Sequence, residues 1–394
     1  MITVSEALSA LFSLTKTLPA ETVPLRAAAG RVLAETVTAG RDQPPFDGSA
    51  MDGYAVNGSD AQPGAQFRVT GESAAGHRFD GTAGPGEAIR IFTGAPMPKG
   101  TNRVVIQEDV RRDGNMITLG DRLDRGDNVR PAGADFRRGD KMQAPRLLSP
   151  SDLALLASMN IAQVRVARRP EVALIATGDE LVLPGETPGP DQIIASNTFA
   201  LEALFRSLGA RTRMLPIARD TRASLRAAFT MAQGADLVIT IGGASVGDHD
   251  LVGTVAEELG VQRSFYKVAM RPGKPLMAGQ MSAETGSAMM IGLPGNPVSA
   301  IVCGHVFVAP VLRAMQGLPA CAAKLYAAAL SQPLAANGPR EHYLRGRITP
   351  EGIFAADRQD SSLLSVLSDA DALILRAPNA PAAVAGETVH YIPI

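Results

Sequence analysis

The sequence VALIATGDE at residues 172–180 is a near-continuous apolar run that ends in a glycine and two acids. Such a run is typical of a parallel strand that is covered on both faces. Further apolar runs lie downstream, at 214–217, 237–241 and 288–293. Helical patterns alternate with these runs, at 196–208, 221–233, 251–259 and 298–315. Strands that alternate with helices over short connections predict a doubly wound parallel α/β domain, which we place at residues 169–316.

The chain before this domain has a different texture. Short strand-like runs separated by Gly, Pro and Asp predict a β-rich domain inserted at residues 41–134. The segments on either side of the insertion, 1–40 and 135–168, are expected to form an N-terminal helical linker region. Within this region, residues 3–17 have the spacing of an amphipathic helix. A Ser or the Asp of Ser149-Pro150-Ser151-Asp152 is expected to cap a second helix.

The chain after the α/β domain again favours β structure. Strand-like runs predict a small β-barrel at residues 317–394, with a sandwich as the alternative. The alanine-rich stretches at 319–330 and 380–385 are expected to be linker and loop. The whole chain is therefore expected to be a multidomain protein that combines α/β with β domains.

Composition and charge exclude several classes of function. Among the 394 residues, 45% are hydrophobic and 20% are charged, which is enough apolar material for several cores. Lys and Arg total 38 and Asp and Glu total 39, so we expect no nucleic-acid or membrane partner. The two cysteines and five histidines match no metal, disulfide or triad pattern. The amino terminus lacks signal-peptide features and no long apolar run follows, which predicts a cytoplasmic protein.

Unusual loops follow three of the predicted strands. Ligands bind beyond the carboxyl ends of the strands in open parallel sheets, where loops converge and helix N-termini point N–H groups at anions. Glycines let the backbone approach a ligand closely, so these loops predict a cradle for a phosphorylated small molecule. A purely structural role for a Gly-Gly turn is the alternative. The loop residues expected to bind the ligand are Gly178, Asp179, Gly242, Gly243, Ser245, Gly247, Pro294, Gly295 and Asn296.

Carboxylates gather at the same loop ends, at Asp179, Glu180, Asp220, Asp248 and Asp250. Several acids beside a phosphate site repel the ligand unless a divalent cation lies between them. Mg²⁺ prefers one or two carboxylates together with phosphate oxygens. We therefore predict a Mg²⁺ site whose ligands are Asp220, Asp248 and Asp250. The alternative for Asp179 and Asp220 is a role as helix N-caps.

Lysine is rare in this chain and is concentrated in one motif. There are six lysines beside 32 arginines, and two of the six, Lys267 and Lys274, lie in KVAMRPGKP at residues 267–275. The Pro-Gly turn fixes the geometry of Arg271 and Lys274, which favours capture of a compact oxyanion. A solvated charge run is the alternative.

The inserted domain begins with PFDGSAMDGYAV at residues 45–56. Small, flexible and acidic residues around one Phe and one Tyr are poor material for a core. We therefore expect this stretch to be a loop that contacts a ligand or a partner.

Seven motifs, in this order along the chain, resemble the molybdopterin molybdenumtransferases, the MoeA family, which is also represented by the E domain of gephyrin. They are FDGSAMDGYAV, IFTGAP, ATGDEL, SNTFAL, GGASVGDHD, KVAMRPGKP and GLPGNPVSA. The resemblance implies an elongated homodimer of four-domain subunits whose α/β domain binds molybdopterin. It also implies Mg²⁺-dependent insertion of molybdate into adenylylated molybdopterin, with release of AMP. Contacts with the molybdopterin adenylyltransferase and with recipient molybdoenzymes are further partners that it suggests.

The resemblance also assigns roles to residues that match the family motifs. It implies catalytic roles for Asp52, Thr93, Arg130, Asp135, Glu180, Asp220, Asp250, Lys267 and Lys274. It places in the cofactor and oxyanion site Ser196, Asn197, Thr198, Arg271, Lys274, Ser299, Arg345 and Ser361. This chain departs from the family where many relatives have KPGKP, because Arg271 supplies a forked donor instead of a point charge. Gly48 replaces a commoner Asn.

Two other functions compete with this interpretation. One is adenylylation of molybdopterin, since the enzymes that perform it share the GGxSxG-type α/β domain. The match over the inserted and C-terminal domains argues against it, because those adenylyltransferases have a single domain. The other is a non-catalytic, gephyrin-like scaffold, for which the sequence contains no supporting feature.

Overall fold

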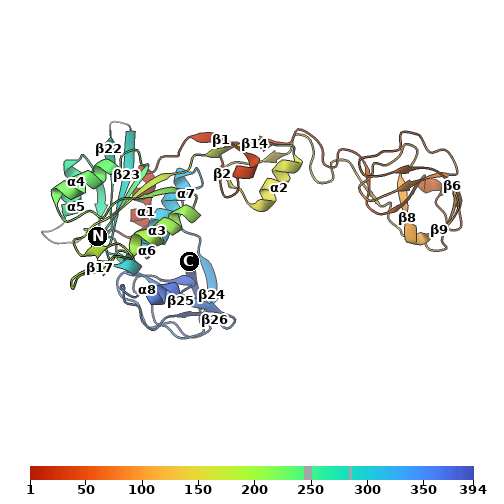
Figure 1. Ribbon diagram of the computed structural model, residues 1–394. Helices are drawn as coiled ribbons and strands as arrows, with labels where there is room; N and C mark the ends of the chain where they lie inside the picture. Colours follow the sequence, from red (N-terminus) through yellow and green to blue (C-terminus); the bar gives the residue numbers. More distant parts are fainter. Residues whose placement is uncertain (244–250, 284–285) are drawn as a thin grey trace.

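The computed structural model describes residues 1–243, 251–283 and 286–394 and shows an elongated molecule (Figure 1). An α/β unit lies at one end, with the C-terminal β unit packed against it. A small unit that contains β1, β2, β14 and α2 forms the middle. The inserted β-rich unit, with β6, β8 and β9, lies at the opposite end of the molecule from the α/β unit.

The sheet of the α/β unit has the order β18-β15-β19-β23-β22-β20. Its parallel strands are β18 Arg211–Met214, β15 Glu171–Ala176, β19 Leu237–Ile241 and β23 Gly286–Leu293. Two antiparallel strands, β22 Met277–Ala283 and β20 Gln262–Tyr266, extend it at one edge. These two strands were not predicted. The connection from β22 to β23 is too short for a parallel crossover, so the chain returns antiparallel.

Helices cover both faces of this sheet, which confirms the doubly wound prediction. Alternate residues of β15 point to opposite faces, with Val172 and Leu174 in one core and Ala173 and Ile175 in the other. The first core is covered by α1 Val4–Leu14, α3 Asn197–Ser207, α6 Pro297–Cys303 and α7 Ala309–Met315. The second is covered by α4 Arg222–Met231 and α5 Leu251–Glu258.

The predicted helix at 298–315 is continuous and apolar, but its hydrogen-bonding pattern changes in the middle. A π-helical turn, Gly304–Val308, joins α6 to α7. In the part of the chain that the structure describes, Pro297–Met315 is the one helix long and apolar enough to cross a membrane by length and composition. Most of this helix is buried inside the protein. Its apolar character therefore has a sufficient explanation in the core of the α/β unit.

The middle unit is built from both sides of the insertion. Its four strands are β1 Ala20–Pro24, β14 Gln163–Ala167, β2 Val32–Leu33 and β13 Arg146–Leu147. Ser149 caps α2 Pro150–Ser158 as predicted: its hydroxyl accepts the Asp152 N–H, and the Asp152 carboxylate accepts the Ser149 N–H at 2.8 Å. Beyond this sheet, a two-stranded ribbon of β3 Val37–Thr38 and β12 Lys141–Met142 carries the chain toward and back from the inserted unit.

The inserted unit is a six-stranded sheet of order β8-β5-β7-β6-β10-β9. The strands are β5 Gly53–Val56, β6 Gln66–Ser73, β7 Glu87–Ile91, β8 Arg103–Ile106, β9 Val110–Asp113 and β10 Met116–Leu119. A further pair joins β4 Gly48–Ser49 to β11 Val129–Arg130.

The prediction that residues 45–56 form only a contact loop is wrong for their second half. Strand β5 is buried inside the inserted sheet, and Tyr54, Ala55 and Val56 belong to its core. Gly53 makes this possible, because a Cβ there would lie 2.0 Å from the Val105 carbonyl oxygen. The absence of a side chain at Gly53 therefore lets two strands approach each other closely.

The C-terminal unit is a curled sheet of order β21-β25-β27-β28-β24, with β26 paired to β25. Its strands are β21 Met270–Arg271, β24 Tyr326–Ala329, β25 Glu341–Thr349, β26 Gly352–Ala355, β27 Ala372–Arg376 and β28 Thr388–Pro393, with the short helix α8 Leu364–Ser368. A bridge between Leu330 and Ile353 brings its two ends together, as in a small barrel. Residues 319–330 are not all linker, because β24 pairs with β28 and Tyr326 packs on Tyr391.

Candidate functional site

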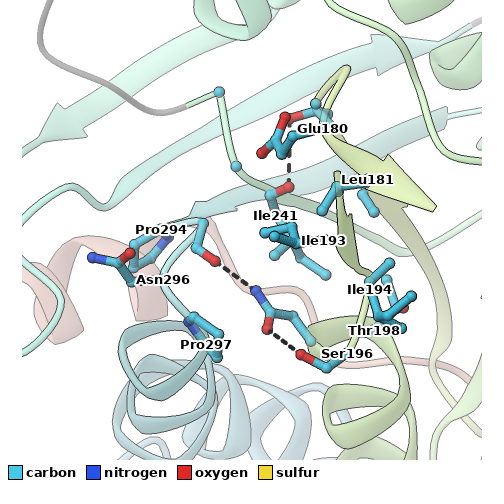
Figure 2. A pocket seen from close by; sticks show the side chains of 18 of the residues that line it. Glu180, Leu181, Ile193, Ile194, Ser196, Thr198, Ile241, Pro294, Asn296 and Pro297 are labelled. Carbon is cyan, nitrogen blue, oxygen red and sulfur yellow. Dashed lines mark hydrogen bonds between the residues drawn. The ribbon is translucent and has the colours of Figure 1, made fainter. Parts of the chain in front are cut away.

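A cavity of about 400 Å³ opens at the carboxyl ends of β15, β19 and β23 (Figure 2). It lies where open parallel sheets bind ligands. The predicted site residues that line it are Gly178, Glu180, Ser196, Asn197, Thr198, Asp220, Gly242, Gly243, Pro294, Gly295 and Asn296. Asp179 is not part of the lining but contacts Asp220. The predicted residues Ser245, Gly247, Asp248 and Asp250 lie outside the described residues.

Glycine is required where the loop after β19 passes the loop after β15. Gly242 has φ +95°, and a Cβ there would lie 2.7 Å from the Thr177 carbonyl oxygen. Across the cavity, the Asn197 side-chain amide donates to the Gly295 carbonyl at 2.7 Å, and the Ser196 hydroxyl donates to Asn197 Oδ1 (Figure 2). These contacts hold the start of α3 against the loop that follows β23.

The cavity has an apolar wall that was not predicted from the sequence. Ile193 and Ile194 form β17 Ile193–Ile194, which pairs with β16 Leu181–Val182. Ile193 is 58% exposed, so its side chain is not part of a core. The signal in the sequence was two adjacent isoleucines inside an otherwise polar, Pro- and Gly-rich stretch. An exposed apolar wall beside polar loops suits a ligand that has a flat organic part and an anionic part.

One carboxylate at the cavity, Asp220, is affected by its surroundings. Burial and the neighbouring charges of Asp179 and Glu180 raise the pKa of Asp220 above its ordinary value. The Asp220 N–H donates to Asp179 Oδ1 at 3.2 Å, which fixes the two acids side by side. No group of three or more His, Cys, Asp or Glu side chains within the described ranges is arranged to hold a metal ion.

The cationic motif forms a closed turn beside the cavity. Backbone hydrogen bonds from Lys267 N to Leu276 O and from Val268 N to Lys274 O join its two arms, both at 3.0 Å. Gly273, at the tip, has φ +114° and sits over the buried thiol of Cys303. Pro275 lines the cavity, while the side chains of Arg271 and Lys274 are exposed. The turn therefore holds two exposed cations close to the cavity wall at Pro275.

The C-terminal unit holds a buried arginine next to the segment that contacts the cavity wall at Asn296. Arg345 is fully buried, and its Nη2 donates to the Asp360 carbonyl at 3.0 Å, while Nε and Nη1 have no partner within the described part of the chain. Burial and the charge of Arg271 lower the pKa of Arg345 to about 10. The next residue, Ser361, accepts hydrogen bonds from Asn296 Nδ2 at 3.2 Å and from the Val298 N–H. Ser299 is buried in α6 near these contacts.

The remaining predicted residues form a second group in the inserted unit. Asp52 Oδ1 accepts hydrogen bonds from the Thr93 N–H at 2.7 Å and from the Thr93 hydroxyl at 2.8 Å, which lowers the pKa of Asp52. Arg130 and Asp135 line a cavity of about 600 Å³ beside Phe46. Within one chain, this group lies at the opposite end of the molecule from the α/β cavity (Figure 1).

The fold and the cavity define a multidomain molybdopterin-binding protein. Residues 173–314 match the family described as "Probable molybdopterin binding domain", which covers the α/β unit and its cavity. Residues 2–160 match the MoeA N-terminal region, domains I and II, and residues 327–394 match the MoeA C-terminal region, domain IV. The chain belongs to the molybdopterin molybdenumtransferase (MoeA) family, a family of transferases of molybdenum cofactor biosynthesis.

Individual relatives agree with this assignment. A molybdopterin molybdenumtransferase of Nostoc sp. is 38% identical over 83% of this chain and 77% of its own length. One of Haemophilus influenzae is 40% identical over 75% of this chain and 73% of its own. The crystal structure of the molybdopterin biosynthesis MoeA protein from Pyrococcus horikoshii OT3 covers 100% of both chains with a TM-score of 0.85 and 26% identity.

Proposed function

We propose that this transferase inserts molybdate into adenylylated molybdopterin in a Mg²⁺-dependent reaction that releases AMP. The observation that carries the proposal is Arg345, whose buried Nε and Nη1 have no partner among the described residues, next to the segment that contacts the α/β cavity at Asn296. Buried donors without partners are costly, and a dianion supplies the missing acceptors. The dithiolene of the pterin supplies the sulfur ligands, so the protein needs only to hold and orient the oxyanion.

The roles that we propose divide between the α/β cavity and an oxyanion site next to it. The residues proposed to hold molybdate are Arg271, Lys274, Ser299, Arg345 and Ser361. Lys267, the Gly-rich loops and the acids are proposed to hold the diphosphate and its metal. The Asn296–Ser361 hydrogen bond at 3.2 Å supports this division, because it joins the cavity wall to the segment beside Arg345.

We propose that Mg²⁺ is bound by Asp220 with Asp250 and Asp248, close to Glu180. The raised pKa of Asp220 supports this, since it marks a gathering of negative charge that a divalent cation would neutralise. When bound, the ion neutralises charge on the diphosphate oxygens during release of AMP. The chain's own acids orient the ion, and the Asp220 N–H to Asp179 contact keeps two of them in register.

We further propose that two copies of the chain form a homodimer in the cytoplasm. The placement of Asp52, Thr93, Arg130 and Asp135 far from their own α/β cavity supports this, because a second copy could bring them to it. The molybdopterin adenylyltransferase as the source of substrate, and molybdoenzymes as recipients of the product, complete the proposal.

A reconstituted assay tests the proposed reaction. Purified protein mixed with adenylylated molybdopterin, molybdate and Mg²⁺ should release AMP and yield a cofactor that activates an apo-molybdoenzyme. Adenylylation of molybdopterin by ATP, without molybdate insertion, would instead identify an adenylyltransferase. Binding without either reaction would favour a scaffold.

The Mg²⁺ requirement should depend on pH through Asp220. A raised pKa means that Asp220 takes up a proton at a higher pH than an ordinary aspartate, and the protonated acid no longer binds the metal. The Mg²⁺ concentration for half-maximal activity should therefore rise as the pH falls, starting above the ordinary range of a carboxyl group. Asp179→Asn removes one like charge while keeping an oxygen acceptor, so it should move this rise to lower pH.

The matched control for this experiment is Asp191→Asn, because Asp191 is an exposed acid that does not line the cavity. Its Mg²⁺ titrations between pH 5 and 8 should match those of the unmodified protein. Binding of Mn²⁺, followed by electron paramagnetic resonance, should show the same shift without relying on turnover. Identical pH profiles for Asp179→Asn and the unmodified protein would remove Asp220 from the metal site.

A further inference from the structure

Three basic side chains lie in one row across the C-terminal sheet. Arg271 of β21 is the register partner of His342 in β25, and His342 is the partner of Arg376 in β27. Neighbouring strands lie about 4.8 Å apart, so the three positions span about 10 Å. Register partners project from the same face of a sheet, and all three residues line one cavity of about 350 Å³. The row therefore presents its nitrogen donors to a common space.

Two of these residues are deeply buried and carry unused nitrogen atoms. His342 is 8% exposed and Arg376 is 7% exposed. Arg376 Nη2 donates to the Pro381 carbonyl, but in residues 1–243, 251–283 and 286–394 neither Arg376 Nε nor His342 Nε2 finds a partner. Buried polar atoms in native proteins nearly always have a partner, and leaving one without a partner is costly. A ligand with acceptor oxygens would satisfy both.

The electrostatic field in this cavity also favours an anion. Burial and the charges of Arg271, Arg345 and Arg340 lower the pKa of His342 to about 4. Among the described residues that line the cavity, Asp357 is the one acid, against the two guanidinium groups of Arg271 and Arg376. Positive charge therefore exceeds negative charge around the unused donors.

This cavity adjoins the proposed molybdate site and shares Arg271 with it, but its other two basic residues, His342 and Arg376, are not part of that site. Successive side chains of a strand alternate between its faces, so His342 and Arg345 point to opposite sides of β25. The packing agrees, because Tyr343 lies in the core shared with the α/β unit and Leu344 lies against the core inside the C-terminal sheet. No described residue lines both this cavity and the α/β cavity.

We propose that the cavity between β21, β25 and β27 is a second anion site, which binds a phosphate-type oxyanion through Arg271, His342 and Arg376. The oxyanion is either free or the head group of a small organic phosphate monoester. The second source has its own support, because Pro333, Leu334 and Leu344 form an apolar wall next to the basic row. The proposed reaction also uses Arg271, so the test is made on His342 and Arg376, which have no part in that reaction.

The test observes the imidazole of His342 in the full-length protein labelled with ¹⁵N-histidine. A ¹⁵N–¹H correlation spectrum, assigned with His342→Gln, is recorded during titration with inorganic phosphate. Phosphate should shift the His342 signal, and Arg376→Gln should raise the concentration needed about ten- to a hundredfold, the range for one charge-assisted hydrogen bond. Arg376→Lys, which keeps the charge, should recover part of the affinity. Arg347→Gln is the matched control, because it removes an exposed arginine of β25 that does not line the cavity.

The source of the oxyanion follows from a parallel titration with phenyl phosphate. Tighter binding of phenyl phosphate than of inorganic phosphate would identify a monoester, and equal binding would identify the free oxyanion. Arg345→Met, which affects the proposed molybdate site, should leave the response largely unchanged, so failure of either proposal can be recognised separately. The second anion site is refuted if neither probe shifts the signal, or if Arg376→Gln and Arg347→Gln behave alike. If Arg376→Gln does not fold, His342→Gln replaces it, with calorimetric titration of phosphate as the readout and the same expected weakening.

Discussion

Asp52→Ala and Lys274→Ala are each expected to abolish nearly all activity, and a re-associated mixture of the two is expected to regain about a quarter of it. Asp52 is held by two hydrogen bonds from Thr93 in the inserted unit, and Lys274 belongs to the turn at the rim of the α/β cavity. The two residues lie in units at opposite ends of the molecule (Figure 1). One active site that uses both must therefore combine two copies of the chain.

The expected recovery follows from the symmetry of a dimer. Random pairing gives about one half mixed dimers, and each mixed dimer has one site with both lesions and one site with neither. Half of the dimers with half of their sites intact gives about a quarter of the original activity. The control is Asp60→Ala mixed with Lys274→Ala, since Asp60 is an exposed acid of the inserted unit outside both cavities. This mixture should retain about one half of the original activity, because every site needs one intact Lys274 and half of the chains supply it.

Molecular mass by light scattering should show that the mixed samples are dimers before activity is compared. Activity near zero in the Asp52→Ala and Lys274→Ala mixture, with the control at one half, would place Asp52 in the site of its own chain. The shared-site proposal would then be abandoned.

Arg345→Met should raise the molybdate concentration needed for half-maximal insertion by roughly ten- to a hundredfold. The guanidinium of Arg345 is buried with two unused donor atoms, and loss of one charge-assisted hydrogen bond costs about 1.5–3 kcal/mol. Methionine fills much of the same volume, so the variant isolates the charge and its donors from the packing. The measurement is the molybdate dependence of AMP release and of cofactor formation.

Two observations distinguish this effect from a loss of structure. Binding of molybdopterin to the α/β cavity should be nearly unchanged, because Arg345 does not line that cavity. Arg347→Met, at an exposed position further along the same strand, should leave the molybdate dependence unchanged. A normal molybdate dependence in a folded Arg345→Met protein would remove Arg345 from the oxyanion site.

The sequence predicted the buried strands of the α/β unit far better than its edges. Strand β19 occupies the predicted residues 237–241, because a strand covered on both faces must be apolar throughout. Strand β18 lies three residues earlier than expected, at Arg211–Met214. It is an edge strand and is largely polar. The apolar run at 214–217, from which a strand was predicted, belongs mostly to the loop that follows it. Strand β24 was missed since alanines at an edge carry little strand preference.

The candidate site divides along the same physical lines. Glycines and acids at strand ends were recognisable because backbone approach and charge restrict residue type, and most of them line the α/β cavity. The apolar pair Ile193 and Ile194 was missed, because an exposed wall has no periodic pattern. The proposed roles of Arg345 and Ser361 came from family resemblance alone. Nothing in the local sequence shows that Arg345 contacts Asp360 or that the next residue, Ser361, contacts the loop at Asn296.

The path of the chain through the inserted unit sets the order in which the protein can fold as it is made. All six strands of the inserted sheet lie between Gly53 and Leu119, so the whole sheet can form once residue 119 has been synthesised. The middle sheet forms later in synthesis, because β2 pairs with β14, which ends at Ala167. Helix α1 waits for α7, which is complete about 300 residues after Leu14, or roughly 15–60 s at about 5–20 residues per second. During that interval its apolar face has no native cover, which makes the first helix a natural client for chaperones that act on nascent chains.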